Sequence, residues 1–139
     1  MTYATQADLE TRFGTEELAQ RTDRINGSVI DASVISRALA DAEAEIDGYL
    51  AKRYQLPLAT VPAVLGRIAC DLARYYLYDD RVIEVVRKRY EDAVRLLKAM
   101  ASGEVKLDAA EALEPAVSGI AVTSRSPERI FNADGLAGY

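Results

Sequence analysis

Hydrophobic residues recur at intervals of three and four along three long stretches of the chain, the spacing of amphipathic helices. We therefore expect long helices at about 33–53, 60–80 and 80–102. Their predicted caps are Asp31 or Ser33 for the first helix, Thr60 for the second and Asp80 for the third, and Gly103 closes the last.

Two shorter amphipathic stretches come before the long helices. Thr5 and Asp8 have the spacing of a helix cap, and Gly14 ends the helix that they begin. Thr15 is the predicted cap of a second short helix, which is over by residue 21 or 22. The pattern predicts an all-α fold, a small bundle of three long helices preceded by short ones.

The apolar stripes of the long helices predict one shared core. Cys70, the single cysteine, cannot form an internal disulfide and is expected to be a small buried hydrophobe. Tyr75, Tyr76 and Tyr78 fit either core packing or a contact between subunits. The predicted core of the helical region 5–102 consists of Ile46, Leu50, Val64, Ile68, Leu72, Val86, Tyr90 and Leu97.

The stretch 45–58 joins the first two long helices and organises the rest of the chain. Ile46, Tyr49, Leu50 and Arg53 share one face at helical spacing. Pro57 then disfavours a helical conformation of the residue before it, so we expect a hinge between two core helices here.

Beyond residue 103 the helical periodicity stops. Residues 104–139 hold short apolar runs broken by Gly and Pro, with the character of a short β-strand over 117–124. Such a segment cannot bury a core of its own, so we divide the chain into a helical body, 1–103, and an extended tail, 104–139, that orders against another surface. The expected apolar and basic anchors of the tail are Arg129, Phe131 and Tyr139.

The composition narrows the classes of function. The 139 residues include no histidine and carry a net charge of −5. The commonest general base and metal ligand is thus missing, and we find no glycine-rich phosphate loop, so we expect neither enzyme activity nor a cofactor. The acidic excess disfavours general nucleic-acid binding. We see no leader segment and no long apolar run, which predicts a cytoplasmic protein without membrane contact.

Two groups of residues invite a metal-ion interpretation, and neither supports it well. The segment 22–33 has the Asn-Gly of a calcium loop, but Arg24 and Ser33 stand where carboxylates are needed, so a simple turn is favoured. Asp71, Asp79 and Asp80 lack a second acidic cluster to complete a coordination shell. We therefore expect no metal site.

Charge is divided unevenly between two of the long helices. Residues 33–51 hold four acidic residues against Arg37, whereas 82–102 hold five basic residues against three acidic ones. Opposite charges on different faces predict a contact between neighbouring subunits. Its predicted residues are Asp41 and Glu45 on the acidic helix, and Arg87 and Arg95 on the basic one. The alternatives are local pairs, Glu84 with Lys88 and Glu91 with Arg95, or DNA contact through Arg87, Lys88, Arg89, Arg95 and Lys98.

Short motifs are spread over nearly the whole chain. They are Tyr3-Ala4-Thr5, Asp8-Leu9, Arg12-Phe13-Gly14, Thr22-Asp23-Arg24, Ile46-Asp47-Gly48-Tyr49-Leu50, Arg53-Tyr54, Leu56-Pro57-Leu58, Val61-Pro62, Asp79-Asp80-Arg81, Arg129-Ile130-Phe131-Asn132 and Gly138-Tyr139. Together these motifs resemble one family, the Mu-like prophage proteins. That family is similar in turn to the small all-helical head–tail connector, or head-completion adaptor, proteins of long-tailed bacteriophages. Residues 25–28 lack the acids that relatives often carry there.

The resemblance implies a structural role without catalysis. Connector proteins assemble into rings, usually of twelve subunits, beneath the portal, and hold a channel open for DNA without reading its sequence. The implied partners are further copies of the chain, the portal protein, and a tail-side connector or tail terminator protein. The tail anchors would then dock on the portal or on a neighbouring subunit. The implied location is the host cytoplasm during assembly and the virion neck afterwards.

A second class of function fits the same sequence. A small helical binding module, such as a regulator or an assembly chaperone acting as monomer or dimer, needs the same compact body and no catalytic set. The size of the oligomer separates this alternative from a ring, and salt-dependent retention on DNA tests the DNA-contacting one.

Overall fold

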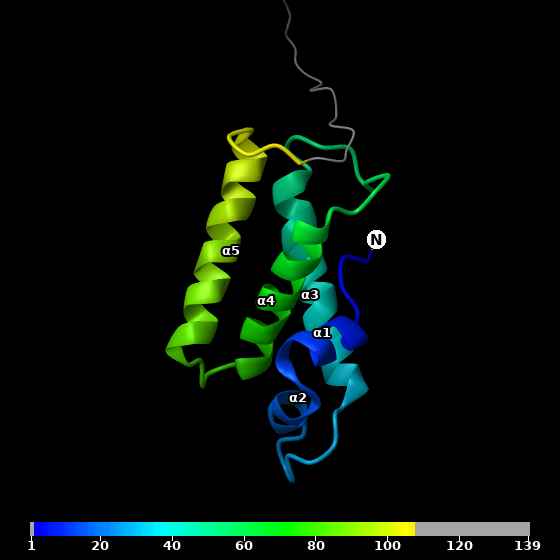
Figure 1. The fold of residues 1–139 in the computed structure, drawn as a ribbon, viewed down its shortest axis with the longest axis vertical. Coiled ribbons are helices and arrows are strands. Elements are labelled where there is room, and N and C mark those ends of the chain that lie inside the picture. The colour runs from blue at the N-terminus through cyan, green and yellow to red at the C-terminus, as the bar shows by residue number, and fades with distance from the viewer. Residues whose placement is uncertain (1, 108–139) are drawn as a thin grey trace, which may run out of the picture.

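The computed structural model describes residues 2–107, which are helical and contain no strand (Figure 1). Two short helices come first, α1 (Gln6–Phe13) and α2 (Thr15–Thr22). Three long helices follow, α3 (Ala32–Leu50), α4 (Ala63–Tyr78) and α5 (Glu84–Ser102). The predicted all-α class is confirmed. The strand character predicted at 117–124 lies outside the described residues.

The three long helices lie side by side and run up, down and up in Figure 1. The central element is α4, which contacts each of the other four helices, whereas α5 contacts only α3 and α4. Helices α1 and α2 pack against α3 and α4. We call α1, α2 and the loop that follows them, up to residue 31, the N-terminal lobe.

Several helix ends are fixed by the capping chemistry that the sequence predicts. Thr5 and Asp8 form a capping box, in which the Asp8 carboxylate accepts the Thr5 N–H at 2.8 Å and Thr5 Oγ1 accepts the Asp8 N–H at 3.3 Å. The Asp31 carboxylate accepts the N–H of Ser33 at 3.0 Å. Gly103 ends α5 in the left-handed region, at φ 87°.

Three predicted caps are wrong. The capping residues are Gly14 rather than Thr15 for α2, Pro62 rather than Thr60 for α4, and Ile83 rather than Asp80 for α5. Pro62 is itself extended, at φ −65° and ψ 148°, so α4 begins at the residue after it. Ile83 is itself extended, at φ −92° and ψ 163°, after a turn closed by the hydrogen bond from the Arg81 N–H to the Tyr78 carbonyl.

Most of the buried apolar residues form one continuous cluster. Most of the predicted core residues are buried, namely Ile46, Leu50, Ile68, Leu72, Val86 and Leu97. The prediction that Val64 and Tyr90 belong to the core is wrong in part, because both pack against it and remain half exposed. Val64 lies in the first turn of α4, and the Tyr90 hydroxyl reaches a carboxylate at the surface. The lobe adds Leu9 and Leu18, both wholly buried, which the predicted core omitted.

The stretch between α3 and α4 turns the chain and also receives the end of the described chain. Helix α3 stops at Leu50, earlier than predicted, because 51–53 form a turn in which the Arg53 N–H donates to the Leu50 carbonyl at 2.9 Å. Tyr54 is buried, and its hydroxyl accepts the N–H of Leu107 at 3.0 Å. Residues 104–107, which the sequence assigned to the tail, therefore pack on the body.

Arg53 and Gly103 meet where α5 ends. Arg53 Nη2 donates to the carbonyl of Ser102 at 3.4 Å, which places a positive charge at the negative end of the helix dipole. The guanidinium lies so close to Gly103 that a Cβ at that position would overlap it. Glycine is thus favoured there by its positive φ, and a Cβ would in addition displace the Arg53 guanidinium.

Ile68 offers a direct test of the core. Its side chain is 0% exposed in the middle of α4, so Ile68→Ala should lower the free energy of unfolding by about 2–5 kcal/mol, measured by urea denaturation. The matched control is Val61→Ala, at a position 36% exposed, where a change within about 0.5 kcal/mol is expected. A similarly small loss for Ile68→Ala would contradict its place in the core.

Candidate assembly surfaces

Cys70 is buried in α4, as predicted, and burial raises the pKa of its thiol to about 11. The thiol therefore stays protonated at neutral pH and packs as a small hydrophobe. Within residues 2–107, no three side chains of His, Cys, Asp and Glu lie together in a way that could hold a metal ion. None of the helices in this same part is long and apolar enough to cross a membrane.

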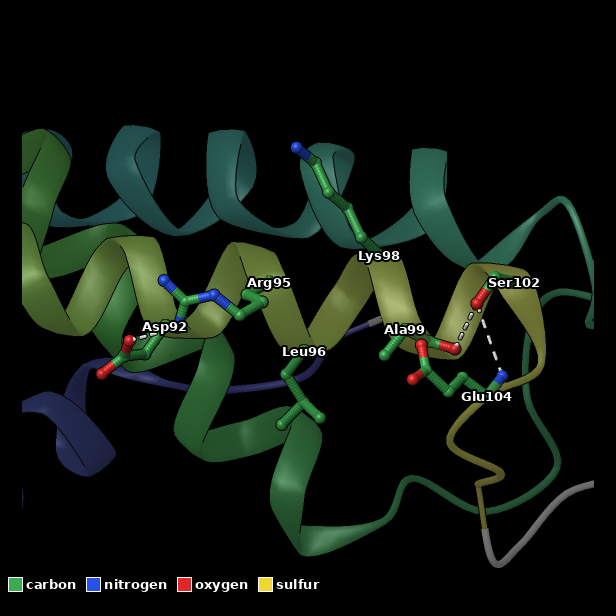
Figure 2. Close-up of a pocket in the computed structure, with 7 residues that line it drawn as sticks. All are labelled: Asp92, Arg95, Leu96, Lys98, Ala99, Ser102 and Glu104. Carbon is green, nitrogen blue, oxygen red and sulfur yellow. Dashed lines mark hydrogen bonds and ion pairs between the residues drawn. The ribbon is translucent and has the colours of Figure 1, made fainter.

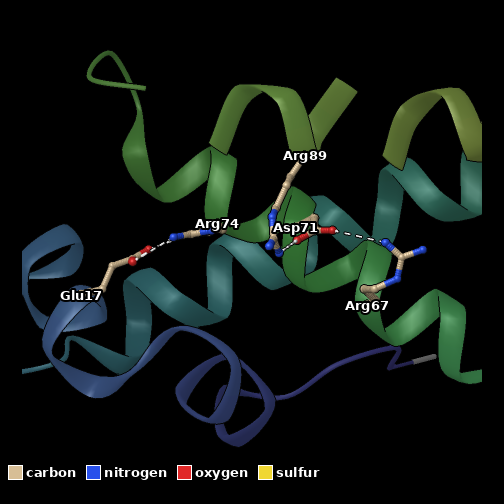
Figure 3. Close-up of polar contacts among 5 residues, drawn as sticks. All are labelled: Glu17, Arg67, Asp71, Arg74 and Arg89. Carbon is tan, nitrogen blue, oxygen red and sulfur yellow. Dashed lines mark hydrogen bonds and ion pairs between the residues drawn. The ribbon is translucent and has the colours of Figure 1, made fainter. Parts of the chain in front are cut away.

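Asp71 is buried in the middle of α4 between two arginines (Figure 3). Its carboxylate lies 3.9 Å from Arg67, one turn earlier, and 3.9 Å from Arg89 on α5. Burial raises the pKa of Asp71, and Arg89 and Arg67 partly oppose that rise. Asp79, considered with Asp71 for an ion site, pairs instead with Arg24 at 3.2 Å, so the structure does not bring these carboxylates together.

A bidentate ion pair fastens the N-terminal lobe to the bundle. Arg74 of α4 donates from Nε and Nη2 to the carboxylate of Glu17 on α2, at 2.7 and 3.0 Å (Figure 3). The same guanidinium lies over the ring of Phe13 from α1, 4.3 Å from its centroid. Two hydrogen bonds and partial burial make this pair stronger than an exposed ion pair. The sequence analysis missed it, because 57 residues separate the partners.

The two predicted acidic residues of α3 lie in different environments. Asp41 is exposed and forms no ion pair with any of the residues 2–107. Glu45 is half buried, and its carboxylate accepts hydrogen bonds from the hydroxyls of Tyr76 on α4 and, at 3.5 Å, Tyr90 on α5. Burial and then this carboxylate raise the pKa of Tyr76, so its hydroxyl remains a donor. Glu45 thus joins the three long helices.

The tyrosines near the end of α4 pack within the subunit. Tyr75 stacks on Tyr90 of α5, with ring centroids 3.9 Å apart. Tyr76 meets both rings edge-on, at 6.1 and 6.2 Å. These rings fill the contact between α4 and α5, and each remains partly exposed at the surface.

Four of the five basic side chains of α5 form ion pairs within the subunit. Arg87 pairs with Glu84 and, at 3.9 Å, with Glu91, and Arg95 pairs with Asp92 at 2.6 Å. The two predicted local pairs, Glu84 with Lys88 and Glu91 with Arg95, are wrong. Both glutamates lie beside Arg87 instead, and Lys88 and Arg95 both lie beside Asp92. Lys88 lies 3.9 Å from Asp92, and Arg89 pairs with Asp71. Of the five predicted DNA-contacting cations, Lys98 alone has no ion pair in the described part of the chain.

An open depression follows the last turns of α5 (Figure 2). Leu96 and Ala99 supply apolar surface, and Arg95 and Lys98 supply positive charge. Near its end, Ser102 Oγ donates to the carbonyl of Ala99 at 3.1 Å. Of the four predicted interface residues on the helices, Arg95 is the one that lines this depression.

The loop after α2 is organised by Asp23, a role the sequence analysis did not assign. The Asp23 carboxylate accepts four backbone N–H groups, from Ile25 at 3.2 Å, Asn26 at 3.1 Å, Ser28 at 3.2 Å and Val29 at 3.4 Å. These bonds, that of Asn26 first, lower the pKa of Asp23. The signal was present, since aspartate commonly folds a following turn by bonding to its backbone.

The described part of the chain is a small all-α protein whose helices are joined by polar contacts. Sequence comparison gives its family. The family described as Bacteriophage Mu, Gp36 matches residues 3–124, so the chain belongs to the Mu Gp36 family. The Mu-like prophage FluMu protein gp36 of Haemophilus influenzae is 41% identical over 105 residues, covering 76% of this chain and 74% of that protein. Gene product J of Escherichia phage Mu is 42% identical over 106 residues, covering 75% and 74%.

The resemblance to Mu-like prophage proteins is therefore confirmed, and the chain is a phage protein. The contact predicted through Asp41, Glu45, Arg87 and Arg95 stays a prediction. The structure shows that Glu45, Arg87 and Arg95 already have partners within the subunit, so Asp41 is the clearest probe of it.

Asp71→Asn tests the balance between burial and ion pairing in α4. Because the folded-state pKa of Asp71 is raised, the folded protein holds this proton more tightly than the unfolded chain. The wild type should therefore lose stability as the pH rises from the unfolded value, about 4, through the folded one. Asp71→Asn should lose less over that interval and be at least as stable at pH 7, measured by urea denaturation at several pH values. A marked destabilisation at pH 7 would mean that the two arginines outweigh burial.

Asp41→Lys tests the predicted contact of the acidic face of α3. Since Asp41 is exposed and unpaired among the described residues, the circular dichroism spectrum should not change, while self-association measured by sedimentation velocity should weaken. Asp41→Asn is the control that separates loss of charge from reversal. Association that is unaffected by both changes would show that this face is only solvated.

Proposed function

We propose that this phage protein is a structural head–tail connector subunit that forms a ring, of twelve copies by analogy, beneath the portal. In that role it joins the head to the tail around a channel through which DNA passes, and it acts without catalysis. Its partners are then the portal protein and a tail-side connector or tail terminator protein. The protein assembles in the host cytoplasm and ends in the virion neck.

The observation that carries this proposal is the match to the Mu Gp36 family over residues 3–124, nearly the whole chain. The described body agrees with a structural role. Its helices are locked by polar contacts between distant segments, such as Arg74 with Glu17 and Tyr76 with Glu45. A ring subunit has to present one surface to one neighbour and a different surface to the other, in the same way in every copy, and a rigid body does so at low conformational cost.

The tail completes the proposal. Residues 129, 131 and 139, its predicted anchors, lie outside the described residues. We propose that they dock on the portal or on an adjacent subunit, because Arg129, Phe131 and Tyr139 are of the types that anchor interfaces. Ordering such a segment costs roughly 1–2 kcal/mol per residue, so a wide and partly apolar docking surface is needed to offset it.

Native mass spectrometry at two protein concentrations tests the ring. A connector should give one large species of fixed subunit number that gains population at the higher concentration, and negative-stain images of it should show an annulus. A chain that remains a monomer or dimer at both concentrations would instead support the alternative, a small helical binding module.

A further inference from the structure

A basic depression lies where the N-terminal lobe meets the end of α4. Arg21, Arg24 and Arg81 line it, together with Asp80. Arg24 is bound to Asp79 at 3.2 Å, and Arg21 lies over the ring of Tyr78 without an ion pair in the described part of the chain. Arg81 is exposed and likewise has no ion pair within residues 2–107. Its positive charge is therefore available to a partner.

An acidic depression lies on the lobe as well. Glu10 and Glu16 line it, and no Lys or Arg does. Glu10 accepts a hydrogen bond from Gln6 at 2.9 Å, and Glu16 is exposed with no ion pair in the part that the structure describes. This depression is therefore negatively charged, whereas the first one is positively charged.

The loop between these depressions displays apolar side chains. Ile25 is 90% exposed and Val29 is 66% exposed, the highest values among the large hydrophobic residues of the described chain. Val29 lines the acidic depression, and Ile25 directly follows Arg24 of the basic one. Because Asp23 fixes the loop through four backbone hydrogen bonds, little loop entropy is left to lose on binding. Apolar side chains flanked by charges are the composition of a protein interface.

The charged residues of the two depressions lie on different faces of α2. Both use α2, and Glu16 and Arg21 are five residues apart on it, which places them about 140° apart around the helix axis. Complementary surfaces on different sides of one subunit favour a head-to-tail contact, which closes into a ring when the rotation permits.

We infer that neighbouring copies of this chain meet through their N-terminal lobes, the basic depression around Arg81 on one copy receiving the acidic depression around Glu16 on the next, with Ile25 and Val29 at the contact. This inference rests on the proposed ring and names the surface that forms it. It is separate from the contact predicted through Asp41, and it does not use Arg87 and Arg95 of α5, which are paired within the subunit.

A charge swap tests this contact with the full chain. Arg81→Glu and Glu16→Lys each reverse one exposed charge, so each variant alone should need about tenfold more protein, or more still, to assemble. In an equal mixture, every contact of an alternating ring is again between opposite charges, so assembly should recover with one-to-one composition by native mass spectrometry. Lys52→Glu, a reversal at an exposed residue outside both depressions, should assemble like the wild type.

The outcomes separate this inference from the proposed ring. A wild type that assembles while Arg81→Glu and Glu16→Lys assemble equally well would overturn the lobe contact and leave the ring. Loss of assembly in both variants without recovery in the mixture would also overturn it. Circular dichroism confirms that each variant is folded, and the neutral variants Arg81→Gln and Glu16→Gln, with weaker effects in the same direction, replace a reversal that fails to fold. A wild type that stays monomeric would overturn both proposals.

Discussion

The burial of α4 is the constraint on which the rest of the described structure depends. Nine of its sixteen residues are buried, and it contacts all four other helices, as α3 also does. Three of its polar side chains, within two turns, reach three different helices. Asp71 pairs with an arginine of α5, Arg74 with a glutamate of α2, and Tyr76 with a glutamate of α3. Apolar packing thus sets how close the helices lie, and these contacts specify which helix lies on which side.

Periodicity was enough to predict the helices and most of the core, because a stripe of apolar residues must face inward wherever the helix packs. Periodicity predicted the first residue of each helix less reliably, because several neighbouring residues can cap the same helix. Thr60 and Asp80 are good capping residues by type, yet the extended conformations of Pro62 and Ile83 moved both helix starts. Predicted charge pairs failed for a related reason, since an acid on α5 can choose between bases three and four residues away.

The candidate surfaces were the hardest part to predict. Net charge per helix singled out α3 and α5, but it counts charges that the fold has already neutralised, as at Arg87 and Glu45. The uncompensated arginines Arg21 and Arg81 belong to distant segments, the N-terminal lobe and the chain after α4, which the Arg24–Asp79 pair, 55 residues apart in the sequence, joins. Only the three-dimensional arrangement shows which charges remain for a partner.

The junction at Gly103 sets the direction in which the chain leaves the bundle. The left-handed glycine under Arg53 reverses the backbone, the Val105 N–H returns to the Ala99 carbonyl at 3.1 Å, and Tyr54 holds Leu107. The starting point of the C-terminal segment is thus fixed relative to the core. In a closed ring, rotational symmetry would repeat that point at one radius and one height, and every subunit would deliver its C-terminal segment to the same level of the assembly as a regular collar of attachment points.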